Sequence, residues 1–594
     1  MAETKAVVVE DGATPVALCE EGRVGRAVQE RLLVEAGDYA VTHGLMIAPK
    51  DNAGRHGRAR RYAVAPCSLV PTAFPRAAFE LGRASQRAWL DLLDAVARDR
   101  DFLTTSLAST CTVDEFTANL MSVYDAAYAA KPQAYTEGTV FAIVRNDYML
   151  HQPEGRAFKD CGIRHVEANT IAASLGALST IISRMHRTLL QRVLRVPASV
   201  LDSHMPPIHV TSSLADGFKA AHDHYVADHR TDGKHPVVVA MIVQPNEFNA
   251  FDQRHLEFAL LERHQLRMVR VSFADVHKYG RRDEHTGRLY IHFPQQTSSD
   301  GDRGASDGDS AAKKAKTEGQ VQQQQQQSNR ATERAQGEEE VVEVSVVYFR
   351  AGYTPNDYPS QAEWDARTQL ELSAAIKCPN IALHLAGTKK VQQVLAKPGT
   401  LERFISGEDA TTLRKTFAAL YSLDPDDYST SEGQQQGNDS TRETQHQQKE
   451  MASVDALLAE IQEHPELYVL KPQREGGGGN HYGREAANML AGMAPSERLA
   501  YIVQSRILPP TQPALVMRDE PVGAPQQSTT ELGLFGVSVR RRGKREAGRA
   551  DSDAADEDHV EDNAGVLLRT KQAESDEVGF AAGFGVLDSP WLTD

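Results

Sequence analysis

A run of four consecutive glycines at residues 476–479 constrains the fold of this chain more than any other feature. Each glycine loses more backbone freedom on folding than any other residue, so an ordered loop of four is costly. Such a loop is typical where backbone N–H groups must lie close to a bulky anion, usually a row of phosphate oxygens. The pattern GxxxxGK[ST] is absent, so this is not a Walker loop.

Charged side chains flank the glycine run. Val469 and Leu470 predict a short buried strand, and Lys471 at its end supplies a positive charge for phosphate oxygens. Glu475 stands at the loop entrance and offers a carboxylate, a type of ligand that suits Mg²⁺. The sequence therefore predicts a phosphate-binding loop beside a magnesium ion. A flexible turn with a solvated charge cluster is the alternative.

Length and charge narrow the class of protein. A chain of 594 residues exceeds the usual size of one domain, and a net charge of −16 argues against a nucleic-acid binder. No stretch approaches about 18 uninterrupted apolar residues, so we expect no membrane span. The five cysteines form no CxxC pair, and the acidic N-terminal stretch lacks the features of a signal or transit peptide. We therefore expect free thiols and a cytoplasmic location.

Hydrophobic spacing predicts an α/β fold. Continuous or alternating apolar runs indicate strands, 3.6-residue spacing indicates helices, and their alternation favours a parallel sheet in an α/β sub-domain. The predicted helices are about 76–130, about 180–194 and the segment FDQRHLEFALLERH. The predicted strands are 139–144 (with Arg145, Asp147 and Tyr148 at its end), 161–170, 237–243, MVRVSFADV and VSVVYF.

Three low-complexity segments interrupt this pattern, at about 297–340, 427–450 and 541–563. The first contains six glutamines at 322–327, and the third runs from basic into acidic residues. None has apolar periodicity, so burial cannot offset their ordering entropy, and we predict three disordered insertions.

Glu167 and Asn169 are two residues apart on a predicted strand. Side chains at this spacing face the same side, so both can offer an oxygen to one ion. With Glu475 they would make a hard-oxygen site for Mg²⁺. A surface glutamate beside an Asx turn is the alternative for the pair taken alone.

Basic side chains follow two further apolar runs. Arg350 and Tyr353 come after VSVVYF, where a guanidinium suits bidentate binding of carboxylate or phosphate. Arg569 and Lys571 come after GVLL. The small-residue turn at 579–583 then either closes over a ligand or leads into the final strand.

Seven blocks together resemble the eukaryotic glutathione synthetase family, from about Pro66 to the C-terminus without the three insertions. They are HVEANTIAAS, FDQR, VVYFRAGY, CPNIALHLAGTKKVQQ, LKPQREGGGGNHYG, ELGLFGV and LLRTK. The resemblance implies an ATP-grasp fold, a homodimer, and Mg²⁺-dependent ligation of glycine to γ-glutamylcysteine with cleavage of ATP. It also implies three regions: an N-terminal part of the ligase body (1–230), a substrate-binding α/β domain (231–386) and an ATP-grasp domain with a C-terminal lid (387–594).

The resemblance assigns expected roles to individual positions. The expected ATP contacts are Glu167, Lys389, Lys471, Glu475, Gly476, Gly477, Gly478, Gly479, Asn480, Tyr482, Gln504, Ser505, Arg506, Ile507, Glu531, Lys571 and Glu577. The expected substrate contacts are Arg145, Ile171, Ala172, Ala173, Ser174, Glu247, Asn249, Gln253, Arg350, Ala351, Gly352, Tyr353, Arg569, Phe580 and Ala581. Glu167, Asn169 and Glu475 match the magnesium ligands, and Arg145, Arg569 and Lys471 the catalytic cations.

Some positions depart from the family pattern. Ala172 replaces a frequent serine, residues 504–506 replace a Met-Glu-Lys run, and Glu577 and Val578 replace Asp-Gly near the closing loop. A ligase that uses β-alanine, alanine or serine in place of glycine is therefore one alternative. The other is a non-catalytic ATP-grasp binding protein partnered through its glutamine-rich insertions. Retention of the metal ligands and of Lys471 favours the enzyme.

Overall fold

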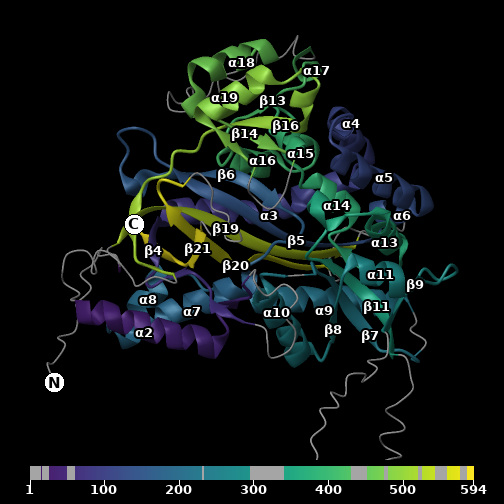
Figure 1. The fold of residues 1–594 in the computed structure, drawn as a ribbon, viewed down its shortest axis with the longest axis horizontal. Coiled ribbons are helices and arrows are strands. Elements are labelled where there is room, and N and C mark those ends of the chain that lie inside the picture. The colour runs from purple at the N-terminus through teal and green to yellow at the C-terminus, as the bar shows by residue number, and fades with distance from the viewer. Residues whose placement is uncertain are drawn as a thin grey trace, which may run out of the picture.

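The computed structural model describes the chain in ten segments and one isolated residue. These are residues 15, 26–49, 61–229, 233–245, 247–293, 340–429, 451–473, 479–518, 525–541, 558–575 and 585–594. Within them, three larger sheets and two short strand pairs, with their covering helices, make up a mixed α/β fold (Figure 1). No helix in these segments has the length and apolar content needed to cross a bilayer.

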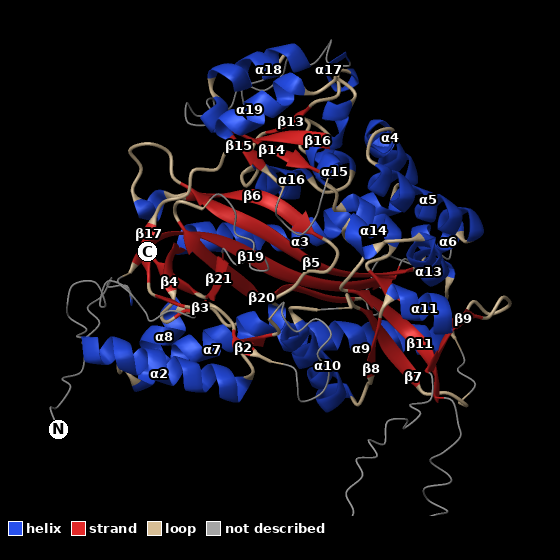
Figure 2. Ribbon diagram, in the orientation of Figure 1, coloured by secondary structure: helices blue, strands red, loops and turns tan. Residues whose placement is uncertain are grey.

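An eight-stranded sheet forms the centre of the described structure (Figure 2). Its neighbours pair antiparallel, apart from one parallel bridge between β21 and β3. In spatial order the strands are β18 (Val516–Met517), β3 (Cys67–Ser68), β21 (Gly585–Asp588), β20 (His559–Gln572), β19 (Gln526–Arg541), β5 (Thr139–His151) and β6 (Gly162–Asn169), with β17 (Gln512–Ala514) beside β19. The sheet thus joins strands from the two ends of the chain, and β6 is its outer strand.

Helices cover both faces of the central sheet, which explains why its strands are apolar on both sides. α3 (Arg76–Arg98) packs on β19, β5 and β6, while α7 (Gly176–Arg192) and α9 (Val210–Asp228) pack on β20 from the other side. Gly82 allows α3 to approach closely, because a Cβ there would lie 2.8 Å from Leu534 Cδ1.

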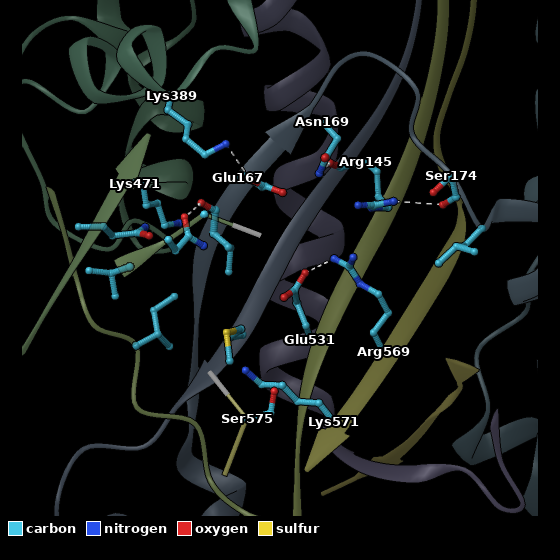
Figure 3. A pocket seen from close by; sticks show the side chains of 18 of the residues that line it. Arg145, Glu167, Asn169, Ser174, Lys389, Lys471, Glu531, Arg569, Lys571 and Ser575 are labelled. Carbon is cyan, nitrogen blue, oxygen red and sulfur yellow. Dashed lines mark hydrogen bonds and ion pairs between the residues drawn. The ribbon is translucent and has the colours of Figure 1, made fainter. Parts of the chain in front are cut away.

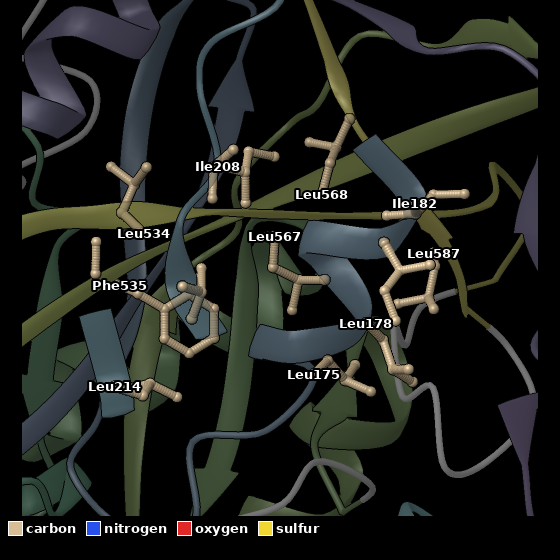
Figure 4. Close-up of a cluster of buried hydrophobic side chains, with 14 of the residues drawn as sticks. Leu175, Leu178, Ile182, Ile208, Leu214, Leu534, Phe535, Leu567, Leu568 and Leu587 are labelled. Atoms are coloured by element: carbon tan, nitrogen blue, oxygen red, sulfur yellow. The ribbon is translucent and has the colours of Figure 1, made fainter. Parts of the chain in front are cut away.

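The core under α7 and α9 holds the sheet in place. It contains Leu178 and Ile182 of α7, Leu214 of α9, and Leu567 and Leu587 of β20 and β21, each at most 4% exposed (Figure 4). Fully burying one such side chain contributes about 1.5–3 kcal/mol. This apolar cluster fixes the position of the central strands, which also carry the polar side chains of the cavity described below.

A six-stranded sheet forms the lower right of Figure 1. β7 (Val237–Ile242), β8 (Met268–Val271), β11 (Glu340–Phe349) and β12 (Ile376–Cys378) pair parallel, as predicted for this sub-domain. β10 (Leu289–Phe293) and β9 (Gly280–Arg282) add antiparallel strands, so the sheet is mixed and not purely parallel as expected.

A four-stranded antiparallel sheet lies at the top of Figure 1 under α18 (Val454–Glu463) and α19 (Gly483–Gly492). Its order is β13 (Leu420–Ser422), β16 (Tyr501–Ser505), β14 (Tyr468–Pro472) and β15 (His481–Tyr482). The predicted strand before the glycine run is therefore present as β14.

The remaining elements connect these layers. The short strand pairs are β1 (Met46–Ile47) with β2 (Ala63–Val64), and β4 (Thr72–Pro75) with β22 (Pro590–Thr593). The other helices are α2 (Arg26–His43), α4 (Arg100–Cys111), α5 (Glu115–Ala130), α6 (Pro132–Thr136), α8 (Ala198–His204), α10 (Ala250–His264), α11 (Phe273–Tyr279), α13 (Gln361–Leu372), α14 (Ile381–Ala386), α15 (Lys389–Leu395), α16 (Gly407–Arg414) and α17 (Asp426–Ser429).

Some predicted boundaries were wrong for identifiable reasons. β5 continues to His151, so Arg145 and Asp147 lie within a strand and not after it, because both faces of β5 are covered. α7 starts at Gly176 and not at 180, because the carboxylate of Asp252 accepts hydrogen bonds from the first N–H groups of the helix. The predicted strand MVRVSFADV ends at Val271, because the next residue starts a capping box for α11.

The edges of the predicted insertions also shift. Residues 559–563 belong to β20, and 559–561 pair with β19, although their sequence is acidic. Asp427 lies in α17, where Lys390 and Lys397 each donate to it at 2.7 Å. Glu340 starts β11. Tyr428 and Ser429 also lie in α17, Arg541 ends β19, and Asp558 is described just before β20. The remaining residues of the three insertions lie outside the described segments, so their disorder stays a prediction, as do the domain boundaries.

Candidate functional site

A cavity of about 410 Å³ lies where the four-stranded sheet faces β6 and the end of the central sheet (Figure 3). This volume is in the range typical of small-molecule sites. Many residues named from the sequence line it together: Arg145, Glu167, Asn169, Ile171, Ala172, Ser174, Glu247, Asn249, Arg350, Tyr353, Lys389, Lys471, Gly479, Asn480, Tyr482, Gln504, Ser505, Arg506, Ile507, Glu531, Arg569 and Lys571.

Strand register brings four polar side chains of β5 and β6 to one face of the sheet. Arg145 lies opposite Asn169, and Asp147 lies opposite Glu167. Each pair of residues on one strand is two apart, so all four side chains project to the same side. The same-side prediction for Glu167 and Asn169 is thus confirmed by their strand.

β19 and β20 add two charged groups beside these. Glu531 and Arg569 are opposite each other across the two strands, and Lys571 lies two residues further along β20. Arg569 and Lys571 therefore lie within a strand and share a face, where the sequence predicted them to follow one.

A network of ion pairs is centred on Asp147, whose side chain is fully buried. Arg145 donates to it twice, from Nε at 2.7 Å and from Nη2 at 2.8 Å, and Arg569 Nη2 donates at 2.9 Å. Asn169 Nδ2 donates to the same carboxylate at 2.9 Å. Arg569 also pairs with Glu531 (Figure 3).

The electrostatics of this network keep Arg569 charged. Burial disfavours the guanidinium of Arg569, but Glu531 and Asp147 raise its pKa above the ordinary value. Burial raises the pKa of Glu531, although the positive charge of Arg569 opposes this shift.

Glu167 lies beside two lysines at the centre of the cavity. Lys389 Nζ is 3.3 Å from its carboxylate. Burial alone would raise the pKa of Glu167, but Lys389, Lys471, Arg145 and Arg569 lower it to about 2. The group is therefore a carboxylate at neutral pH.

Residues of the four-stranded sheet close the cavity on one side. Lys471 Nζ donates to Val166 O and Gln504 Nε2 to His165 O, each at 3.2 Å, so this sheet is attached to the backbone of β6. The guanidinium of Arg506 lies 5.8 Å from the ring centre of Tyr482. Lysines, amides and a cation–aromatic pair suit a ligand with both phosphates and a flat ring.

The opposite side of the cavity is supported by Asp252 of α10. Its carboxylate pairs with Arg350 at 3.0 Å and accepts from the backbone N–H of Leu175 and Ala177 at 3.0 and 2.9 Å. Leu175 and Ala172 adopt left-handed backbone angles, φ +71° and +51°, which are uncommon for residues other than glycine. Such strain often occurs in loops that contact a ligand.

A second carboxylate arranges hydrogen-bond groups on this side. Glu247 accepts from Asn249 N at 2.8 Å and from Gln253 Nε2 at 2.5 Å. Asn249 Oδ1 is buried without a hydrogen-bond partner and belongs to a cavity-lining residue. An unpaired buried acceptor is costly, so this oxygen is suited to a donor from a ligand.

Not every predicted residue reaches the cavity. Ala173, Gln253, Ala351 and Gly352 are described but do not line it. Gln253 is fully buried between Glu247 and Arg270, which explains its inward position. Glu475, Gly476, Gly477, Gly478, Glu577, Phe580 and Ala581 lie outside the described residues.

The cavity also includes residues that sequence reasoning missed. They are Met149, Val166, Leu175, Gln244, Phe248, Val469, Pro472, Pro509, Thr511, Thr529, Ala573 and Ser575. Gln244 follows the end of β7 as Arg350 follows β11, so the strand-end argument could have found it. Most of the others are apolar or small, and the sequence holds no signal that separates them from ordinary core residues.

Comparisons with known proteins show which family the chain resembles as a whole. The family model "Eukaryotic glutathione synthase, ATP binding domain" matches residues 26–592. The chain is 34% identical to glutathione synthetase of Rattus norvegicus, over 95% of this chain and 96% of that protein. It is 33% identical to the chloroplastic glutathione synthetase of Arabidopsis thaliana, over 95% of this chain and 85% of that one.

A solved structure has a similar fold. It is the apo form of a glutathione synthetase-like effector from Globodera pallida, with a TM-score of 0.62 at 19% sequence identity, covering 96% of this chain and 97% of that one.

Proposed function

The chain belongs to the eukaryotic glutathione synthase family, and from this premise we propose how its cavity carries out the family's reaction. The protein is an ATP-dependent ligase that forms glutathione, so its substrates are ATP, γ-glutamylcysteine and glycine. One observation supports placing the reaction in this cavity. Glu167, Asp147 and their cationic partners lie between a phosphate-suited side and a side rich in carboxylate- and amide-binding groups.

The fold supports an ATP-grasp arrangement. Nucleotides in such folds bind between two sheets, and here the cavity lies between the four-stranded sheet and β6. Lys471 on β14 and Lys389 on α15 both lie close enough to Glu167 to lower the pKa of its carboxylate. We assign these lysines to the phosphates of ATP.

The reaction needs activation of a carboxylate, because an acid and an amine do not condense at neutral pH. The cysteinyl carboxylate attacks the γ-phosphorus of ATP, which forms an acyl phosphate and releases ADP. The glycine amine then attacks the acyl carbon, and phosphate leaves as the amide bond forms. Arg145 and Arg569 stabilise the negative charge that develops on the oxygens, and no side-chain nucleophile takes part.

The donor atoms present fit a magnesium ion. Glu167 is ionised, and Asn169 uses its amide nitrogen on Asp147 and Arg145 O, which leaves its oxygen for a cation. These are hard oxygen ligands. Among the described residues no group of three or more His, Cys, Asp or Glu side chains forms a complete metal site, and Glu475 lies outside them. A bound Mg²⁺ would neutralise phosphate charge there.

A labelled-substrate assay tests both the acceptor and the intermediate. ADP release and product mass are measured with γ-glutamylcysteine and glycine, β-alanine, alanine or serine in turn. We expect glutathione with glycine as the best acceptor. With a heavy-oxygen label in the cysteinyl carboxylate, one labelled oxygen should appear in the released phosphate.

The outcomes separate the alternatives. Faster turnover with alanine, β-alanine or serine would make this a ligase for another acceptor, and no ADP with any acceptor would favour a binding protein. Unlabelled phosphate in an active enzyme would contradict the acyl phosphate. Homodimer formation and a cytosolic location stay predictions.

A further inference from the structure

We propose that Asp147 is the positioning residue of the active site: its buried carboxylate fixes Arg145, Asn169 and Arg569 in one arrangement and so couples the binding of the dipeptide acid to the binding of the divalent cation. The proposal rests on the function assigned above. Asp147 is 0% exposed and does not line the cavity, so it acts through these partners and not on the substrate.

Asp147 determines which donors of the two arginines face the cavity. A guanidinium has five N–H donors. Arg145 directs Nε and Nη2 to Asp147 and Nη1 to Ser174 O, which leaves one hydrogen on each Nη atom. Arg569 uses Nη2 on Asp147 and Glu531, which leaves Nη1 and Nε, of which Nε is buried without a hydrogen-bond partner. Both arginines line the cavity, so these remaining donors are the ones a substrate oxygen can reach.

Asp147 also determines how the amide of Asn169 is turned. A carboxylate can only accept hydrogen bonds, so the Asn169 side chain must direct its nitrogen to Asp147, 2.9 Å away. The second hydrogen of that nitrogen goes to Arg145 O at 3.2 Å. The amide oxygen is therefore left as the atom that can ligate a cation, and a flipped amide would present a nitrogen that cannot.

The strands are built to hold this carboxylate in place. Gly533 of β19 lies opposite Asp147, and a Cβ there would lie 2.8 Å from Asp147 Oδ1 and 2.9 Å from Arg145 Cδ. The missing side chain lets the ion pair lie across β19 and reach Arg569 on β20. The arrangement therefore spans four strands of the central sheet.

The test compares Asp147→Asn with wild type in a binding experiment without turnover. Mn²⁺ is titrated into the full chain with a non-hydrolysable ATP analogue, and bound metal is followed by water-proton relaxation. An amide at 147 can donate to Asn169 and let it flip. We expect the Mn²⁺ dissociation constant to rise about 10–100-fold, as for other residues that orient metal ligands. In activity assays the KM for γ-glutamylcysteine should rise as well.

A control variant and a double-mutant cycle distinguish a positioning role of Asp147 from a general loss of stability. Asn146→Ala changes the residue that precedes Asp147 in β5, which is equally buried and donates to Gln86 at 2.7 Å on the other face. It should lower the melting temperature and leave the Mn²⁺ constant unchanged. Asn169→Ala should weaken Mn²⁺ binding as Asp147→Asn does, and the double variant should be no worse than either single one.

Asp147→Glu keeps a carboxylate that can accept hydrogen bonds, and it is measured in the same double-mutant cycle. The proposal can therefore still be tested if Asp147→Asn does not fold. It should retain tighter Mn²⁺ binding than Asn169→Ala. The proposal would be overturned by unchanged Mn²⁺ binding in Asp147→Asn, by Mn²⁺ binding in Asp147→Glu as weak as in Asn169→Ala, or by additive effects of Asp147→Asn and Asn169→Ala. A wild-type protein that binds the Mn²⁺–nucleotide normally but makes no glutathione would instead refute the proposed function.

Discussion

Replacing Gly387 by alanine should displace Thr170 and, through the backbone, its neighbour Asn169 in the active site. Gly387 follows α14 with a helical φ of −81°, so its backbone accepts any residue and the effect is purely steric. The added Cβ would lie 2.2 Å from Thr170 Oγ1 and 2.9 Å from Thr170 Cγ2. Thr170 directly follows Asn169 and is 3% exposed, so it has little room to turn away.

The expected magnitude follows from these distances. Ordinary contact begins at 3.4 Å, so the two groups must separate by 3.4 − 2.2, or about 1.2 Å. Overpacking of this kind costs about 1–3 kcal/mol of unfolding free energy. A shift of about 1 Å in a catalytic group lowers the rate about 100-fold. We expect Gly387→Ala to show both effects, because Thr170 and Asn169 are neighbours in the chain.

A second substitution makes the reasoning refutable. Thr170→Ala removes Oγ1 and Cγ2 and leaves only the contact to Cβ, at 3.1 Å. The double variant should therefore recover most of the kcat/KM and of the urea midpoint lost in Gly387→Ala. ADP release and chemical unfolding measure the two quantities. A fully active and stable Gly387→Ala enzyme, or a double variant no better than the single one, would refute the steric argument.

Three further predictions concern single charged or titrating groups. Burial lowers the pKa of His151 to about 4, and its Nδ1 accepts from Leu508 N at 3.2 Å. As the pH falls from about 6.5 to about 4, this histidine takes up a proton in the unfolded chain but not in the folded protein, so the free energy of unfolding falls. His151→Gln should make the urea midpoint less dependent on pH across that range. Burial opposes ionisation of Asp427, but two lysines lower its pKa to about 2. Asp427→Asn should therefore lower the free energy of unfolding by roughly 1–3 kcal/mol at pH 7. This difference from wild type should vanish as the pH falls from about 4 to about 2, because the wild-type carboxylate is then protonated. Glu167→Gln removes an ionised ligand and should reduce ADP release to background while the circular dichroism spectrum stays unchanged; normal turnover would contradict its assigned role.

Residues beside regular strands were the part of the site that the sequence could predict. The two-residue spacing of Glu167 and Asn169 placed them on one face, and β6 confirms it. The apolar run before Lys471 is β14, and the run before Arg350 is β11. These inferences depend only on alternation along one strand, which local sequence determines.

Strand pairing between distant segments could not be predicted. The local sequence predicts Asp147 at a strand end, whereas its central position depends on β20 lying two strands away. The local sequence predicts only that Asp252 lies in a helix, yet its carboxylate caps a different helix and pairs with Arg350. Neither arrangement leaves a pattern in the local sequence, because both depend on which segments pack together.

The order of strands in the central sheet has a consequence for synthesis of the protein on the ribosome. β19, β20 and β21 all come after residue 525, yet they lie between β3 and β5, which are made first. The early strands therefore leave the ribosome with unpaired edges. The sheet cannot be completed until nearly the whole chain has left the exit tunnel. Contacts of such large sequence separation form slowly, and open edges attract other chains. Nascent chains that stall before β19 should depend on chaperones to stay unaggregated.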